Sequence, residues 1–323
     1  MVGKKILITG GSGYIGARLC LHFANEGYAV TAICHSKVPL DKNWTSKMDQ
    51  VVVGDIRDEE LINELAEKNY DLVVHLVSLD HHQSAGSPSF VSSVNITPVW
   101  SLLDIFSKKG LKKFIYFSTA QVYGQLGDDT ILENQIIKPQ NPYGLTHQIG
   151  EVLCDYYNRN SSVDCSVIRL SNSYGAPLFE ENNCWWLVIN DLCKMAFSKN
   201  EIVLQSDGSP LRDFIHGWDV CKGVQTIVET NDNNLVYNLS SGKTLSILDI
   251  AEKIKEIYLD RYNVELNITK AKSENTVAKK NPYKIDNSLI RSIGFESKWT
   301  LEMGINDLFD FLEKKEATAL NKK

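Results

Sequence analysis

The sequence that decides the fold is a glycine-rich stretch near the N-terminus, Gly10-Gly11-Ser12-Gly13-Tyr14-Ile15-Gly16. It follows an apolar run at residues 5–9 and opens a segment with helical spacing. Glycines at this spacing permit a tight turn, let the backbone approach a pyrophosphate and allow a helix to pack closely on a strand. A plain glycine turn is the alternative, but the strand–turn–helix context favours a dinucleotide site. That site would be formed by Gly10, Gly13, Tyr14, Ile15 and Gly16.

Short apolar runs alternate with amphipathic segments through the first half of the chain. Runs that are apolar throughout are typical of parallel strands covered by helices on both faces. We therefore expect an α/β fold with a doubly wound parallel Rossmann sheet and a smaller C-terminal α/β lobe. Strands are expected at residues 5–9, 29–34, 50–53, 72–76, 114–117 and 166–170.

The strand–helix regularity weakens after Ser171, where clusters of Asn, Gly and Ser follow. Residues 212–229 again have the pattern of a strand followed by a helix. We therefore expect a discontinuous division of the chain. The dinucleotide-binding Rossmann domain would comprise residues 1–173 and about 211–236, and the substrate lobe residues about 174–210 and 237–323.

The residues after the second expected strand bear on which dinucleotide binds. That strand usually ends in an acidic residue that accepts hydrogen bonds from the adenosine ribose. Here Cys34 stands at that place, followed by His35, Ser36 and Lys37. Without a carboxylate nothing repels a 2′-phosphate, and the three following residues could contact one, so NADP is slightly favoured over NAD. The alternative is a loop that is merely solvated.

Two later segments are also expected beside the dinucleotide. Asp55 closes the third apolar run and could accept a hydrogen bond from the adenine amino group, with Ile56 next to it. The residues at the end of the fourth strand and after it would run along the cofactor. They are Leu76, Val77 and Ser78.

Four further segments, taken with the glycine stretch, resemble the extended short-chain dehydrogenase/reductase family, and within it the NAD-dependent epimerase/dehydratase group that acts on nucleotide sugars. The segments are Ser118-Thr119-Ala120-Gln121-Val122-Tyr123-Gly124, Asn141-Pro142-Tyr143-Gly144-Leu145-Thr146-His147, Arg169-Leu170-Ser171-Asn172-Ser173-Tyr174-Gly175 and Arg212-Asp213-Phe214-Ile215-His216. They extend over nearly the whole chain. The resemblance implies NAD or NADP as the cofactor and a nucleotide diphosphate sugar as the partner.

The resemblance also implies catalytic roles. Thr119 holds the place of the hydroxyl that hydrogen-bonds the reacting group of the sugar, and Tyr143 that of the acid/base. A tyrosine in solution has a pKa of about 10, so the site must stabilise its phenolate. Family members use a lysine four residues later and the positive charge of the cofactor for this purpose.

This sequence departs from the pattern, because His147 stands where the family has that lysine. One helical turn places His147 on the same face as Tyr143. An imidazole with an ordinary pKa of about 6.5 is mostly neutral at pH 7, although it can still hydrogen-bond the nicotinamide ribose. We expect an enzyme that turns over, with a steeper pH dependence. A slow enzyme and a dinucleotide-binding protein that has lost catalysis are the alternatives.

The two residues after Thr119 bear on the reaction. Family members that eliminate water usually carry an Asp-Glu pair there, whereas Ala120 and Gln121 can neither donate nor accept a proton in that role. A 4,6-dehydratase is therefore disfavoured. Redox chemistry at C4 remains, as a 4-epimerase that retains its cofactor or a 4-keto-sugar reductase that exchanges NADPH. A net dehydrogenase stays open.

Several residues are expected at the substrate. By the resemblance, Asn172 and Arg212 would bind the diphosphate, and a guanidinium fork suits that task. The alternative for Arg212 is a surface pair with an acid such as Asp213. His81 and Gln121 are expected to contact the sugar. No metal is expected, because the two adjacent histidines on the loop of His81 have no third ligand.

Composition excludes several partners. The 323 residues carry a formal net charge of -6 and include seven cysteines that are never spaced as CxxC. These features argue against nucleic-acid binding and for reduced thiols. No stretch approaches the roughly 18 apolar residues of a membrane span, and no signal-peptide core is evident. We expect a cytoplasmic protein with no membrane partner.

A homodimer is also expected, because relatives commonly pair through two helices, here residues 90–108 and 143–158. Ile149, Leu153 and Tyr157 are spaced to supply such a face, although core packing explains them equally.

Overall fold

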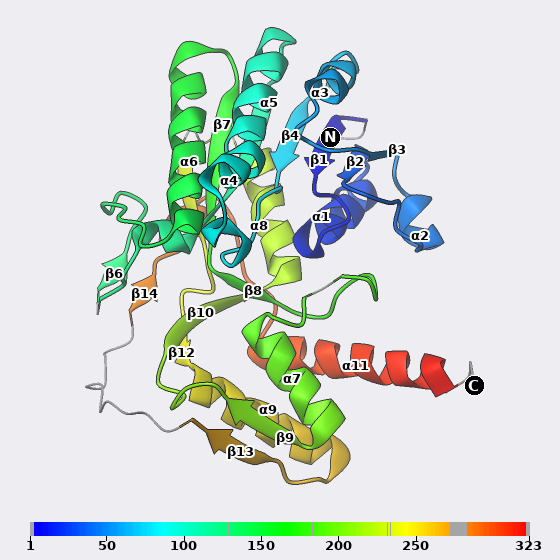
Figure 1. Ribbon diagram of the computed structural model, residues 1–323, viewed down its shortest axis with the longest axis vertical. Helices are drawn as coiled ribbons and strands as arrows, with labels where there is room; N and C mark the ends of the chain where they lie inside the picture. Colours follow the sequence, from blue (N-terminus) through cyan, green and yellow to red (C-terminus); the bar gives the residue numbers. More distant parts are fainter. Residues whose placement is uncertain are drawn as a thin grey trace.

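The structure is a computed structural model, and it describes residues 3–127, 129–182, 184–230, 232, 234–271 and 283–320. Its largest part is a seven-stranded parallel sheet with the order β11-β7-β5-β4-β1-β2-β3 (Figure 1). The expected doubly wound Rossmann fold is therefore confirmed. The strands are β1 (Lys5–Thr9), β2 (Ala29–Cys34), β3 (Gln50–Val53), β4 (Leu72–His75), β5 (Lys113–Thr119), β7 (Asp164–Leu170) and β11 (Val236–Leu239).

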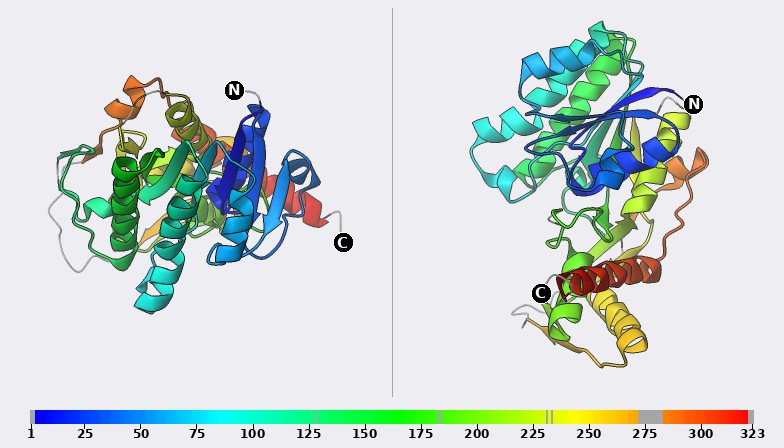
Figure 2. Two further views of the ribbon diagram at one scale, coloured as in Figure 1. Left: turned by 90° about the horizontal axis from the view of Figure 1, so that it is seen from above. Right: turned by 90° about the vertical axis from the view of Figure 1, so that its right-hand side faces the viewer.

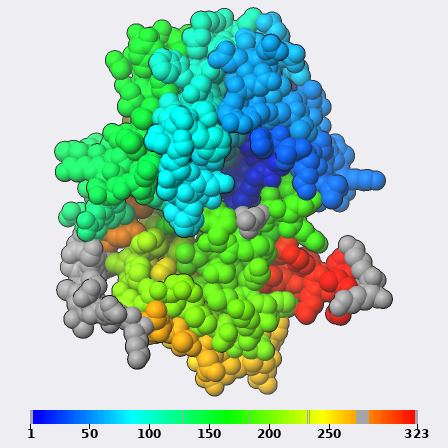
Figure 3. Space-filling view, viewed as in Figure 1, coloured from blue at the N-terminus to red at the C-terminus, as the bar shows by residue number. Residues whose placement is uncertain are grey.

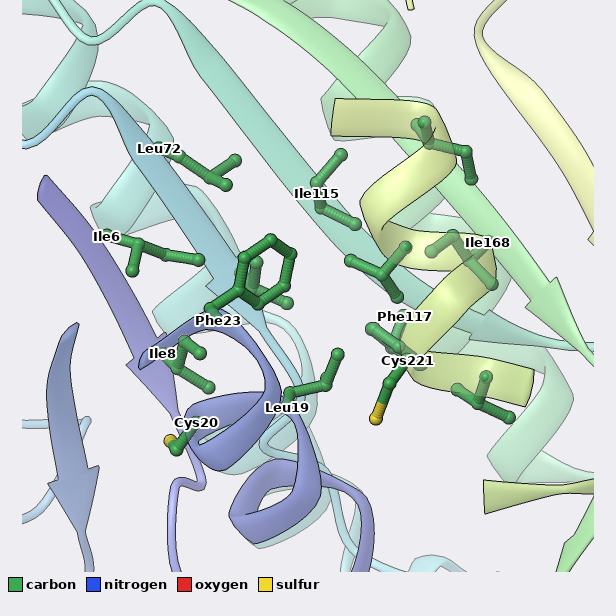
Figure 4. Packing of buried hydrophobic residues seen from close by; sticks show 14 of the residues in the cluster. Ile6, Ile8, Leu19, Cys20, Phe23, Leu72, Ile115, Phe117, Ile168 and Cys221 are labelled. Carbon is green, nitrogen blue, oxygen red and sulfur yellow. The ribbon is translucent and has the colours of Figure 1, made fainter. Parts of the chain in front are cut away.

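Helices cover both faces of this sheet because its strands are apolar on both sides. Ile6 and Ile8 of β1 point to the face covered by α1 (Tyr14–Asn25) and α8 (Gly217–Glu229), and Figure 4 shows them beside Phe23. Leu7, between them, points to the opposite face. That face is covered by α3 (Glu59–Ala66), α5 (Thr97–Lys108) and α6 (Pro142–Asn160), and α4 (Pro88–Asn95) packs against α5 and α6.

The smaller lobe lies below the main sheet (Figure 2). It has a three-stranded sheet with the order β12-β10-β8 and a separate pair of β9 with β13. Its core gathers apolar side chains from three helices. The elements are β8 (Asn172–Tyr174), α7 (Val188–Lys199), β9 (Glu201–Leu204), β10 (Leu211–His216), β12 (Thr244–Ser246), α9 (Ile247–Tyr262), β13 (Asn267–Lys270) and α11 (Leu301–Leu320).

The remaining elements are short. They are α2 (Lys42–Thr45), η1 (Gln83–Ala85), η2 (Ala120–Tyr123), β6 (Thr130–Ile131), β14 (Lys284–Ile285) and α10 (Ser288–Ser292). None of the helices among the described residues is long and apolar enough to cross a membrane.

The later part of the chain crosses between the two lobes more often than expected. β11 begins at the last residue of the expected second Rossmann segment, continues beyond it and pairs with β7 in the main sheet. Ile290 and Phe295 also pack in the core of the main sheet. β10 pairs with β8 and β12 instead. A four-residue strand such as β11 has no periodicity long enough to assign it to a sheet.

The strand order reverses between β1 and β4. The chain runs outward from β1 through β2 and β3, and then returns to β4 on the other side of β1. Ligands of doubly wound sheets bind outside the carboxyl ends of the strands at such a reversal. At this position the surface is recessed between the first residues, in blue, and the segment after β4, in cyan (Figure 3).

Candidate active site

The glycine-rich turn joins β1 to α1 at this reversal. Gly10 has a φ of 70°, which only glycine adopts without cost. A Cβ at Gly16 would lie 2.0 Å from the carbonyl oxygen of Gly10. Gly13 is the N-cap of α1 and has no side chain that could cap it, so the first N–H groups of the helix stay available. The turn therefore fits the pyrophosphate of a dinucleotide.

The two residues that follow Gly13 contribute differently. Tyr14 turns its phenol to the second lobe, where it donates a hydrogen bond to the carbonyl oxygen of Gly175 over 3.1 Å. Its backbone N–H still belongs to the first turn of α1. Ile15 is half-buried and packs against the core of the main sheet.

Charged groups gather where β2 and β3 end. Cys34 is buried at the end of β2, while His35, Ser36 and Lys37 after it are exposed. An acidic residue beyond the end of β3 lies in this cluster, because the carboxylate of Asp55 is 3.6 Å from Nε2 of His35.

Arg57 is a member of this cluster that the sequence did not single out. Its Nε and Nη2 donate to the two carboxylate oxygens of Asp55 over 2.9 and 2.5 Å. This pairing holds the pKa of Asp55 well below its usual value. Ile56, between the two charged residues, is buried. The spacing i, i+2 beyond a strand was the available signal for Arg57, and it does not fix the loop conformation.

Three hydroxyl groups converge beside the glycine turn. Thr119 ends β5, Tyr143 lies in the first turn of α6, and Ser78 follows β4 with Leu76 and Val77 before it. The side chains of Thr119 and Ser78 act on the phenol of Tyr143 and lower its pKa. The sequence named all three residues, and the structure brings them together.

The start of α6 is held in place by side-chain contacts. Asn141 caps the helix, because its Oδ1 accepts from the N–H of Gly144 over 2.8 Å. Its amide donates to Oε1 of Gln121 over 2.9 Å. Gln121, expected at the sugar, is exposed on η2. Through its hydrogen bond with Asn141 it also orients the helix that carries Tyr143.

His147 lies one turn after Tyr143, as the sequence predicts. Its Nδ1 lies 2.8 Å from the carbonyl oxygen of Tyr143, and the two rings are 4.3 Å apart. Only 3% of His147 is exposed. Burial lowers the pKa of His147 to about 4. The imidazole is therefore neutral at pH 7.

The acid/base candidate is also shifted. Burial raises the pKa of Tyr143 to about 12, the hydroxyls of Thr119 and Ser78 lower it, and the carboxylate of Asp80 raises it. Asp80 was not expected near the phenol, because its position depends on the path of a loop that has no periodic pattern. The site without its cofactor therefore favours the protonated phenol.

The loop after β4 is anchored to α6. Oδ1 of Asn95 accepts from the N–H of Leu79 over 2.8 Å, and its Nδ2 donates to Oγ1 of Thr146 over 3.0 Å. Oδ1 of Asp80 accepts from the N–H of Gln83 over 2.8 Å. His81, expected at the sugar, is exposed on this loop.

The residues expected at the diphosphate lie on neighbouring strands of the second lobe. Asn172 on β8 and Arg212 on β10 are both exposed. Nδ2 of Asn172 donates to the backbone oxygen of Asp213 over 2.9 Å. The carboxylate of Asp213 is buried and accepts from the N–H groups of Ser241 and Lys243. The alternative of a pair between Arg212 and Asp213 is therefore wrong, since the acid points inward.

Within the described ranges, no group of three or more His, Cys, Asp or Glu side chains is placed to hold a metal ion.

Comparison with known proteins identifies the family. A sequence profile of the NAD dependent epimerase/dehydratase family matches residues 6–240. The chain belongs to this family. The resemblance seen in the motifs is therefore confirmed, and so is the assignment of the fold.

Individual family members are distant in sequence but similar over most of their length. The low-salt glycan biosynthesis protein Agl12 of Haloferax volcanii is 26% identical over 315 residues, which is 95% of this chain and 97% of that protein. A putative UDP-glucose 4-epimerase of Methanocaldococcus jannaschii is 28% identical over 83% of this chain and 91% of its own. The UDP-glucuronic acid 4-epimerase of Bacillus cereus, solved with NAD, has 25% identity and a TM-score of 0.76, covering 96% and 99% of the two chains.

Proposed function

We propose that this family member is an NAD-dependent enzyme that catalyses redox chemistry at C4 of a nucleotide diphosphate sugar, as a 4-epimerase or a 4-keto-sugar reductase. The observation that carries the proposal is the convergence of Thr119 and Tyr143 beside the glycine turn. Ala120 and Gln121 supply no acid or base for eliminating water, which supports C4 redox over dehydration. The relatives are enzymes, which favours catalysis over a binding protein without turnover.

The residues of the site have distinct tasks in this proposal. The first turn of α1, from Gly13 to Gly16, binds the pyrophosphate through backbone N–H groups. Thr119 holds the C4 hydroxyl or carbonyl of the sugar by a hydrogen bond. Tyr143 takes the proton from that hydroxyl when the sugar is oxidised and returns it when the carbonyl is reduced. The bound nicotinamide would supply the acceptor and donor of hydride.

The diphosphate of the substrate would be bound in the second lobe. Arg212 carries an exposed guanidinium with no carboxylate within ion-pair distance among the described residues, and Asn172 lies on the adjacent strand. His81 and Gln121 are proposed at the sugar because both are exposed on segments that flank Tyr143. The roles expected for these four residues stay predictions.

NAD is the proposed cofactor, because the family is NAD dependent and the Bacillus cereus enzyme was solved with NAD. The slight preference for NADP, which the sequence suggests through Cys34, is the alternative. Asp55 beside His35 opposes a 2′-phosphate, while Arg57 neutralises that carboxylate. Titration with NAD⁺ and NADP⁺ distinguishes the two: tighter binding of NADP⁺ would contradict the proposal.

A homodimer and a cytoplasmic location are also proposed. The seven cysteines are buried free thiols, which suits a reducing compartment. The expected dimer face has to be corrected, because Tyr157 is only 8% exposed and Leu153 packs against the core. The exposed apolar residues of the two helices are Trp100 on α5, and Leu145, Val152 and Tyr156 on α6.

The test of the function is conversion of defined sugars. The protein is incubated with NAD⁺ and with UDP-, dTDP- or GDP-linked glucose and galactose, and proton NMR follows the C4 configuration. 4-Keto sugars are tested with NADH and NADPH. We expect turnover of at least one substrate, lost in Tyr143→Phe and retained in Tyr156→Phe, an exposed tyrosine on the same helix. Binding of cofactor without conversion of any of these sugars would support the binding-protein alternative.

A further inference from the structure

The hydrogen bond of His147 determines which of its nitrogens carries the proton. Nδ1 faces the carbonyl oxygen of Tyr143 over 2.8 Å. A carbonyl oxygen can only accept, so Nδ1 must donate. In a neutral imidazole the other nitrogen then carries a lone pair. Nε2 is therefore an acceptor, whereas the lysine of the family at this position is a donor with a full charge.

The surroundings of His147 keep it neutral. Tyr143 faces it from its own helix, and Tyr116 faces it from β5 with the ring centroids 6.2 Å apart. The ring of His75 on β4 lies 6.2 Å from that of Tyr116, and a charge on His75 would oppose one on His147. Glu151, one turn further along α6, is paired with Arg169, whose Nη2 donates to Oε2 of Glu151 over 2.7 Å. No carboxylate among the described side chains faces the imidazole.

The phenol of Tyr143 has no cation beside it either. The groups that act on it are the hydroxyls of Thr119 and Ser78 and the carboxylate of Asp80. The loop of Asp80 is fixed next to α6 through Asn95, as described above. Within the described part of the chain, the charge near the phenol is therefore negative.

We propose that His147 is a positioning residue that stays neutral and accepts a hydrogen bond through Nε2, so that Tyr143 loses its proton only when an oxidised nicotinamide brings a positive charge to the site. This inference rests on the proposed NAD-dependent function. His147 stands in place of the lysine of the family, with the opposite hydrogen-bonding polarity. Ionisation of the phenol then depends on the oxidation state of the cofactor.

Binding of NAD⁺ and release of the Tyr143 proton are then linked. The positive charge of NAD⁺ favours the phenolate, and the proton is released to solvent. By thermodynamic reciprocity, a rise in pH must strengthen NAD⁺ binding. NADH lacks that charge, so a rise in pH does not strengthen its binding. The ratio of the Kd of NADH to the Kd of NAD⁺ should therefore rise with pH, approaching tenfold per unit once the phenol titrates in the NAD⁺ complex.

The experiment measures both dissociation constants on the full chain between about pH 6 and pH 10, by calorimetry for NAD⁺ and by fluorescence for NADH. We expect the ratio to rise in the wild type and in Tyr156→Phe, and to stay flat in Tyr143→Phe. His147→Gln, neutral and able to accept, should keep the pH of the rise. His147→Lys should move the rise to lower pH.

Two outcomes overturn the inference while leaving the function intact. One is a flat ratio in a wild type that binds both cofactors, and the other is the same rise in Tyr143→Phe. Failure to bind either cofactor would refute the proposed function itself. The two kinds of failure are therefore distinguishable.

A second measurement does not depend on a lysine being tolerated in this buried position. Nitrogen-15 NMR of the wild type, assigned by comparison with His147→Gln, reports which nitrogen of the ring is protonated. We expect one protonated Nδ1 and one unprotonated Nε2 from about pH 6 to pH 8. An imidazolium, or a proton on Nε2, would overturn the proposal.

Discussion

At the scale of single residues, Asp80 and His147 make the proton chemistry of this site unusual. A phenol that must lose a proton has a carboxylate acting on it and a neutral imidazole one helical turn away. Before the cofactor binds, both features leave the phenolate less stable than the protonated phenol. The pH profile is consequently the property of this enzyme that single substitutions should change most clearly.

Replacing Asp80 by asparagine should lower the pKa of Tyr143, because a nearby negative charge opposes formation of the phenolate. The amide oxygen can still accept from the N–H of Gln83. In the direction that removes a proton from the sugar, the rising limb of kcat/KM should move to lower pH by up to about one unit. The measurement is the pH profile with the active sugar. Asp260→Asn, exposed on α9, serves as the control, and an unmoved limb in Asp80→Asn would contradict the argument.

The residues that sequence could assign are those whose role follows from local spacing. The glycine turn and the relation of His147 to Tyr143 are set within a few residues of chain. Arg57, and the effect of Asp80 on the phenol, could not be assigned because each residue acts from a loop, and no periodic pattern tells where a loop carries its side chains. Their contributions appear only in the folded chain, where Arg57 pairs with Asp55 after β3 and Asp80 acts on Tyr143 of α6.

At the scale of elements, α6 carries Tyr143, His147 and Glu151 on one face at intervals of four residues. The last of these fastens the helix to the sheet. Glu151 accepts from Arg169 of β7 and from Ser118 of β5, and the two charged side chains are each 6% exposed. A buried pair of this kind fixes the helix that positions the acid/base.

Glu151→Ala should therefore destabilise the protein strongly, because it leaves the guanidinium of Arg169 buried and unpaired. We expect a loss of about 3–5 kcal/mol in the free energy of unfolding. Asp155→Ala breaks the exposed pair with Arg159 on the same helix and should cost less than about 1 kcal/mol. Urea denaturation of both variants gives the comparison, and equal losses would show that burial does not govern these pairs.

The turn between β1 and α1 gives a second prediction for an element. Gly16→Ala places a methyl group against the carbonyl of Gly10, which has to move. That shift changes the direction of the N–H groups at the start of α1, so NAD⁺ affinity should fall by at least about tenfold, or about 1.4 kcal/mol. Gly127→Ala, on an exposed loop, is the matched control. Calorimetry measures the NAD⁺ affinity of both variants, and retained affinity in Gly16→Ala would refute the glycine turn as the pyrophosphate-binding site.

At the scale of the whole molecule, the alternation of strands and helices was predictable because each run is apolar throughout and long enough to be recognised. The division into lobes was harder. β11 and α10 return to the main sheet from within the C-terminal half: pairing with β7 assigns β11, and packing of Ile290 assigns α10. Local pattern specifies an element, whereas its partner in the fold depends on packing across the whole chain.

Buried neutral histidines make the stability of the fold depend on pH. Burial lowers the pKa of His147 to about 4 and that of His75 to about 3. Both titrate near pH 6.5 when unfolded, so below that pH the unfolded chain binds protons first and the free energy of unfolding decreases. For His147 the decrease amounts to about 3 kcal/mol between pH 6.5 and pH 4. Urea titrations at several pH values should show a shallower acid loss in His147→Gln, and identical slopes would contradict the assignment.

The proposed dimer is tested on the face formed by α5 and α6, which lie side by side (Figure 1). Val152, 59% exposed, lies on this face with Trp100 and Tyr156. Pairing this face with its copy would bury an apolar patch in a four-helix bundle, and a twofold axis would bring Val152 of both copies into the same interface. Val152→Glu should therefore leave two desolvated carboxylates there and shift the protein to monomer. Sedimentation equilibrium measures this shift, with Val264→Glu in the second lobe as the control. A monomeric wild type, or a Val152→Glu variant that still dimerises, would move the interface elsewhere on the molecule.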